Sequence, residues 1–173
     1  MPSTVAPITD ELIHSSIVSA VRGVCATMLK FDASFLQKTL EPDNEPFKAQ
    51  PHVFGCVGFV GKVDGVVHLC ITRDFAIHAA STLLGMTEAE LQSDQDTVKD
   101  VVGEIPNMTV GCFKNALCDK GYTCMLTLPT IVHGQNLAVA AVKSSNRQIF
   151  HFDAIGYRIV ADIQILPKPP GAA

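Results

Sequence analysis

Residues 53–72 read VFGCVGFVGKVDGVVHLCIT, and this stretch carries the clearest structural signal in the chain. Two runs of β-branched and apolar side chains, residues 53–60 and 66–72, flank a short segment that contains Asp64 and Gly65. Asp-Gly between two such runs is typical of a β-hairpin, because both residues tolerate the backbone angles of a tight turn. The sequence therefore predicts two antiparallel strands. Three glycines of the first run are interpreted as bulges or bends: Gly55, Gly58 and Gly61.

Segments with helical periodicity precede and follow this hairpin. Apolar residues recur at intervals of three and four from Thr9, a good helix cap, to about Lys30. The same spacing appears in residues 72–84 and 97–120, and each of these segments is followed by a glycine that suits a helix C-terminus. Residues 87–96 are acidic and are expected to hold a short helical turn. We therefore expect two long helices with shorter ones between them.

Further strands are expected after the longest helix, at residues 122–128, 137–142, 148–152 and 158–166. The order of helix, hairpin, helices and strands predicts an α+β fold, in which an antiparallel sheet packs against two long helices. We expect one domain with a flexible segment at each end: residues 9–166 for the domain, and 1–8 and 167–173 for the ends.

The composition excludes several classes of protein. The 173 residues are 47% hydrophobic and 17% charged, with a net charge of −4, which fits neither a disordered chain nor a general binder of nucleic acid. No uninterrupted apolar run approaches the roughly 20 residues that span a bilayer, and the N-terminus lacks a secretory signal, so we expect a cytoplasmic protein without membrane partners. The six cysteines form no CxxC pair and are interpreted as small buried residues, so no metal site is predicted.

One face of the longest predicted helix carries an unusual set of residues. At about 100° per residue, Asp100, Glu104, Asn107 and Gly111 form a narrow stripe that we expect to face solvent. The two acids repel each other, and asparagine and glycine are poor helix formers, so a functional surface and an ordinary solvated face are both open interpretations. Pro106 is expected to kink the helix. The apolar residues predicted to face the core are Val101, Val102, Ile105, Met108, Cys112 and Ala116.

The spacing Asp-x3-Glu-x2-Asn in this stripe, with its nearby glycine and with Pro129 further along, resembles the signature of the CheC/CheX/FliY phosphatases of bacterial chemotaxis. The similarity extends to the hairpin turn at residues 61–65, the helix end at 83–85 and the segment 128–134. It covers roughly residues 10–166 and is greatest to the CheX branch. The resemblance therefore implies a CheC/CheX-like form of the α+β fold.

The resemblance also implies a role for each residue of the stripe. In this family the matching Glu and Asn enter the active site of a phosphorylated receiver domain such as CheY. Carried over, Asn107 would orient the water that attacks the aspartyl phosphate, and Glu104 would pair with the receiver's lysine. Asp100, Gly111 and Pro129 would support the motif. The Mg²⁺ would belong to the receiver, this chain would hold no cofactor of its own, and it would form a homodimer.

A single site is expected, because the first helix lacks the second motif of CheC-type members. His14 stands three residues after Glu11, where an asparagine would be needed. Two alternatives to a phosphatase stay open. The stripe could serve a non-catalytic module that docks on a receiver or a flagellar switch component, or it could be vestigial in a structural dimer. His133 is a further candidate for contact with the partner.

Overall fold

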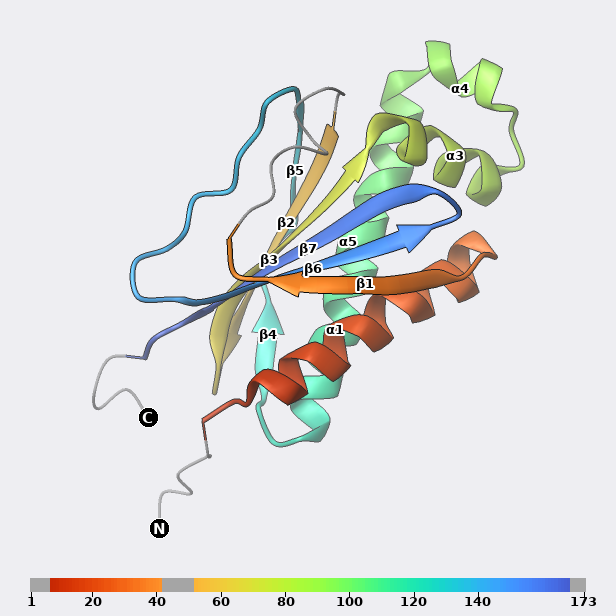
Figure 1. Cartoon of the computed structure of the whole chain (residues 1–173). Helices are drawn as coiled ribbons and strands as arrows, with labels where there is room; N and C mark the ends of the chain where they lie inside the picture. Colours follow the sequence, from red (N-terminus) through yellow and green to blue (C-terminus); the bar gives the residue numbers. More distant parts are fainter. Residues whose placement is uncertain (1–6, 42–51, 169–173) are drawn as a thin grey trace.

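The computed structural model describes residues 7–41 and 52–168, and its centre is one antiparallel sheet (Figure 1). The strand order is β1-β6-β7-β3-β2-β4, and β5 pairs with the same edge of β2 as β4 does. The strands are β1 (Ala33–Thr39), β2 (His52–Gly61), β3 (Asp64–Thr72), β4 (Cys124–Leu126), β5 (Thr130–Gly134), β6 (Asn146–Ala154) and β7 (Tyr157–Leu166). The predicted α+β class with an antiparallel sheet is confirmed.

The predicted hairpin is β2 and β3. The Gly61 backbone nitrogen donates to the Asp64 carboxylate at 2.8 Å, which closes the turn. The register runs without a shift from the His52–Thr72 pair to the Phe59–Gly65 pair, so Gly55 and Gly58 form no bulge and that part of the interpretation is wrong. Each of the three β2 glycines leaves room for a neighbouring segment. A Cβ would lie 2.1 Å from Pro106 Cγ at Gly55, 3.1 Å from Thr127 at Gly58 and 2.4 Å from the Thr123 carbonyl oxygen at Gly61.

The predicted helices are present and are capped by their own side chains. They are α1 (Asp10–Val24), which continues into the π-helical segment η1 (Cys25–Leu29), α3 (Arg73–Leu84), α4 (Glu88–Ser93) and α5 (Gln95–Asp119). Thr9, Thr72 and Thr87 each accept a hydrogen bond from a backbone nitrogen in the first turn that follows. Lys30 (φ 62°) and Gly85 (φ 68°) end η1 and α3 in the left-handed conformation.

The two long helices, α1 and α5, lie side by side on one face of the sheet (Figure 1). Their apolar side chains form one core with the inward side chains of β2, β3, β6 and β7. Phe113 of α5 meets Phe59 of β2 edge-on, with ring centroids 5.8 Å apart. The packing of the sheet against two long helices is therefore also as predicted.

The segment Asp10–Leu29 is, among the described residues, the one helix long and apolar enough to cross a membrane by length and composition. Its apolar side chains Ile13, Ile17 and Val24 are buried in the core shared with the sheet and α5. The core helix of a water-exposed domain passes the same test, so the finding does not itself indicate a membrane span.

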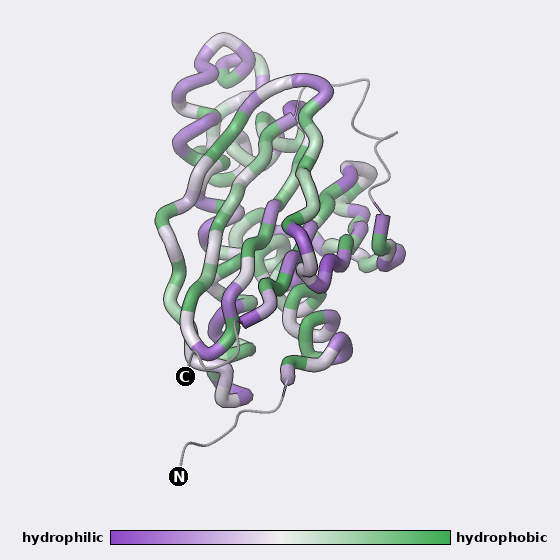
Figure 2. The backbone as a smooth tube through the Cα atoms, turned by 90° about the vertical axis from the view of Figure 1, so that its left-hand side faces the viewer, coloured by the Kyte–Doolittle hydropathy of each residue, from purple (hydrophilic) through white to green (hydrophobic). Residues whose placement is uncertain are grey.

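The second face of the sheet is turned toward the viewer in Figure 2, where hydrophilic and hydrophobic stretches alternate along the strands. The strand predicted at residues 137–142 is wrong, because this segment has no regular structure. Side chains of the sheet satisfy its backbone instead. Gln164 accepts from the Val142 nitrogen at 2.7 Å and donates to the Ala140 carbonyl at 3.0 Å, and Arg147 donates to the Val139 carbonyl at 3.0 Å.

Other differences from the prediction are smaller. The strands β1 and β5 were not predicted, and the strand predicted at residues 122–128 is only Cys124–Leu126. The strands predicted at 148–152 and 158–166 are present and slightly longer, as β6 and β7. The predicted flexible ends lie largely outside the described residues, which begin at residue 7 and end at residue 168.

Candidate functional site

The predicted stripe lies on α5, whose start is fixed by Asp94. The Asp94 carboxylate accepts from the Thr97 backbone nitrogen at 3.2 Å and from the Thr97 hydroxyl at 2.8 Å. This cap satisfies a backbone NH that the first helical turn leaves without an intrahelical partner. The helix then continues through Pro106 as far as Asp119, so the proline does not end it.

The stripe presents its polar groups to the outside. Asp100 and Glu104 are exposed, and Asn107 and Gly111 are half-buried. Their spacing of four, three and four residues puts them on one helix face. Within residues 7–41 and 52–168, the side chains of Asp100, Glu104 and Asn107 form no hydrogen bond or ion pair with another residue. Two carboxylates and a carboxamide are therefore available together to a partner molecule.

The buried face of α5 is rotated relative to the predicted one, by roughly 70° on the same helical wheel. Cys112, which was predicted to face the core, is exposed, and Met108 is only half-buried. The predicted burial of Cys112 is therefore wrong. The side chains that α5 buries are Val98, Val102, Ile105, Pro106, Thr109, Val110, Phe113 and Leu117.

The prediction left out several apolar positions that α5 buries, and it did not foresee the contact between Pro106 and Gly55. A Cβ at Gly55 would lie 2.1 Å from Pro106 Cγ and 2.3 Å from Pro106 Cβ, so nothing larger than a hydrogen fits between the helix and the strand. Pro106 is thereby buried, and Asn107 lies at the border of the buried face while Glu104 stays exposed. Two signals in the sequence indicate the observed face: a glycine at an inward-facing strand position, and the helical spacing of the apolar residues Val98, Val110, Phe113 and Leu117.

The strand β5 runs beside the same part of α5. Ile131 of β5 pairs with Gly55, and its Cγ1 would be in ordinary contact, at 3.5 Å, with a Cβ at Gly103. Pro129 is exposed in the connection between β4 and β5. It therefore lies one residue before the strand that packs next to Gly103, the neighbour of Glu104 in the chain.

On α1, His14 occupies the position where a second motif would need an asparagine. The ring of His14 packs against Phe35, with centroids 4.9 Å apart, and against Phe150, at 5.7 Å. His14 thus has a packing role, in keeping with a single site on α5. Over the described parts of the chain, no group of three or more His, Cys, Asp or Glu residues is arranged to hold a metal ion. That the chain has no cofactor of its own stays a prediction.

The sheet with α1 and α5 on one face is the fold of the CheC/CheX-like class of α+β proteins. The family model described as "Chemotaxis phosphatase CheX" matches residues 53–153, which is more than half of the chain and includes the whole stripe. The protein therefore belongs to the CheX family of chemotaxis phosphatases.

Solved structures with the same fold cover almost all of the chain. A CheC-like superfamily protein from Shewanella sp. PV-4 has 24% identity and a TM-score of 0.78, over 92% of this chain and all of that one. CheX from Vibrio vulnificus has 21% identity and a TM-score of 0.74, over 89% and 99%. The Borrelia burgdorferi CheX-CheY-BeF3-Mg²⁺ complex matches with 22% identity and a TM-score of 0.70, over 90% and 98%. No curated protein matches the chain.

Proposed function

We propose that this protein is a phosphatase that accelerates hydrolysis of the aspartyl phosphate of a CheY-type receiver domain, and so ends a chemotaxis or other two-component signal. Membership of the CheX family supports phosphatase activity, and the matching CheX-CheY complex supports a receiver as the partner. The observation that carries the proposal is that Glu104 and Asn107 lie on one accessible face of α5 without partners within the described chain.

The chemistry fits the side chain of Asn107. Phosphoryl transfer needs little covalent chemistry from the catalyst, and most of the gain comes from positioning and charge stabilisation. A carboxamide both donates and accepts, so Asn107 can hold an attacking water in line without removing its proton. Asn107 is half-buried and follows the tightly packed Pro106, so its side chain has less freedom than a fully exposed one. A side chain with restricted movement is better suited to holding a water in one position.

The rest of the stripe fits docking. Glu104 offers an exposed carboxylate that can pair with a receiver lysine, and Asp100 adds a negative charge one turn earlier. Gly111 has no packing reason to be glycine, because a Cβ there would meet nothing within 4 Å. A glycine at this position leaves space for close approach by another surface. The Mg²⁺ that assists the reaction would be held by the receiver.

The test is the dephosphorylation rate of a phosphorylated CheY-type receiver, measured with and without the protein. Asn107→Ala should reduce the acceleration by about 100-fold, the size of effect seen when one positioned donor is removed from an active site. It should leave the affinity for a phosphoryl-mimic receiver nearly unchanged. Asn115→Ala is the matched control, because Asn115 is exposed on the same helix eight residues later.

The competing outcome is the non-catalytic docking module. In that case neither the wild-type protein nor the variant accelerates hydrolysis for any receiver of the source organism, although the phosphorylated receiver binds. Equal loss of rate in the Asn107 and Asn115 variants would instead show general disruption of α5. The homodimer and the cytoplasmic location are further proposals from the family resemblance, and sedimentation and cell fractionation test them.

A further inference from the structure

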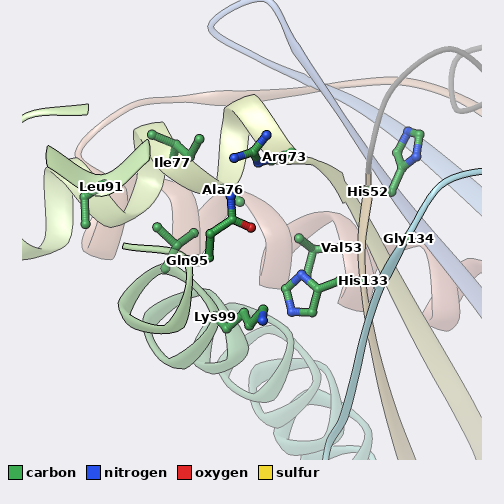
Figure 3. Close-up of a pocket in the computed structure, with 11 residues that line it drawn as sticks. His52, Val53, Arg73, Ala76, Ile77, Leu91, Gln95, Lys99, His133 and Gly134 are labelled. Carbon is green, nitrogen blue, oxygen red and sulfur yellow. The ribbon is translucent and has the colours of Figure 1, made fainter. Parts of the chain in front are cut away.

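A second candidate site lies away from the Glu104–Asn107 stripe, between α3, the first turns of α5 and β5. It is a surface cavity of about 100 Å³, enough for roughly three water molecules. Figure 3 shows the polar ends of its lining side chains: Gln95 reaches toward Arg73, and the Lys99 ammonium points toward the ring of His133. Val53, which pairs with His133 in the register of β2 and β5, is a further lining residue.

The cavity concentrates positive charge without neutralising it. Arg73 and Lys99 come from different helices, and none of the described residues that line the cavity is an aspartate or glutamate. Arg73 has no hydrogen bond or ion pair with any part of the chain that the structure describes. Lys99 meets Asp96 at 3.4 Å, but that pair is long and largely exposed, so it contributes little. Two cations that line the same concave surface, one without a partner and one in a weak exposed pair, create a positive local potential that favours an anion.

Two neutral side chains that line the cavity can donate hydrogen bonds to an anion. Gln95 offers two N–H donors, and neutral His133 offers one. Burial and the charge of Lys99 both lower the pKa of His133, so its imidazole is held toward the neutral form while the cavity is empty. The charge of Lys99 therefore disfavours a second positive charge on His133 and favours a bound anion.

We propose that this cavity binds a small free oxyanion of the phosphate or carboxylate class, with Arg73 and Lys99 as its charged contacts and Gln95 and His133 as hydrogen-bond donors. The size limits the ligand to a single anionic group. Lys99 directly precedes Asp100 in α5, so an anion held there changes the charge at one end of the stripe. The proposal concerns the protein by itself and does not rest on the phosphatase function.

The experiment titrates inorganic phosphate, and acetate separately, into the protein without any receiver at constant ionic strength. Binding is followed by calorimetry and by the NMR signals of the His133 ring. We expect saturable binding, together with a rise in the pKa of His133, since a nearby anion favours the imidazolium. Arg73→Gln and Lys99→Gln should each weaken binding by about tenfold or more, the effect of losing one charged hydrogen bond.

Arg22→Gln is the matched control, because Arg22 is exposed on α1, outside this cavity, and it should bind like the wild type. Equal weakening in Arg22→Gln would overturn the proposal, because it would show a non-specific effect of net charge. So would a His133 pKa that does not respond to either anion. If the protein alone binds neither anion, but Arg73→Gln weakens binding of a receiver, the cavity holds an acidic side chain of that partner and the free-anion proposal is wrong.

Discussion

Gly55 of β2 and Pro106 of α5 are in such close contact that a Cβ on the glycine would lie 2.1 Å from Pro106 Cγ. Real Cβ atoms do not approach other atoms so closely, and the proline ring cannot rotate away as a flexible side chain would. The contact therefore sets how closely α5 approaches β2 at this point. Since Asn107 follows Pro106 directly, the same contact places the proposed water-orienting side chain.

Replacement of Gly55 should disturb stability and activity together. Gly55→Ala forces α5 away from β2, and overpacking of this kind costs about 1–3 kcal/mol in the free energy of unfolding. We also expect a lower dephosphorylation rate, because the displacement moves Asn107 while leaving its chemistry intact. Urea denaturation and the receiver assay measure the two effects.

Gly23→Ala is the control for Gly55→Ala. Gly23 lies in α1 on the exposed side, and a Cβ there would meet nothing within 4 Å. Alanine is a better helix former than glycine, so this variant should be more stable by about 0.5–1 kcal/mol. A Gly55→Ala protein that is as stable and active as the wild type would show that α5 is not fixed by this contact.

Charge reversal at Glu104 tests docking separately from catalysis. Glu104→Lys places a cation where the proposal requires a partner for the receiver's lysine, so affinity for a phosphoryl-mimic receiver should fall by at least about tenfold. Asp119→Lys reverses an exposed acid at the far end of α5 and should have little effect. A titration in which Glu104→Lys binds as tightly as the wild type would remove Glu104 from the interface.

The ion pair between Arg147 and Asp162 should matter for stability rather than for activity. It joins β6 and β7 on the second face of the sheet at 2.5 Å, with only 11% and 8% of the side chains exposed. Arg147→Met leaves the Asp162 charge buried without this partner and should cost about 3 kcal/mol. The double variant Arg147→Met, Asp162→Leu removes both charges and should recover most of that loss in thermal unfolding. Failure to recover would mean that packing of the arginine stem dominates.

Stability should decrease in mild acid, partly through His68. This residue lies opposite Asp162 in the register of β3 and β7, and burial, with a smaller effect of Arg147, lowers its pKa below the ordinary 6.5 although Asp162 acts in the other direction. A lowered pKa in the folded state means that the unfolded chain binds the proton first. Stability is therefore fully present above about pH 6.5 and is lost as the pH falls from there toward the folded pKa.

The variant His68→Gln isolates this contribution, since the pKa values of His52 and His133 are also lowered by burial. Its free energy of unfolding should depend less on pH than that of the wild type between pH 7 and pH 5, a range that brackets the ordinary histidine pKa. Parallel pH curves for the two proteins would show that His68 has the same pKa in both states.

Local sequence was enough for much of the secondary structure. Thr72 and Gly85 mark the two ends of α3, as predicted, because capping and glycine chemistry act over a few residues. Asp64 likewise marks the β2–β3 turn. The prediction of a strand at residues 137–142 is wrong because this segment depends on distant contacts. Its backbone groups bind the side chains of Arg147 and Gln164, which are distant in sequence, so no local pattern predicts it.

The sequence by itself determined the α+β class, the long helix and the spacing that puts Asp100, Glu104 and Asn107 on one face of it. These properties follow from helical periodicity, which any stretch of chain carries within itself. Only the tertiary structure decided that Pro106 also lies on the buried face, because its place depends on a contact with Gly55, a residue far away in the chain. Close packing between distant elements cannot be deduced from either element alone.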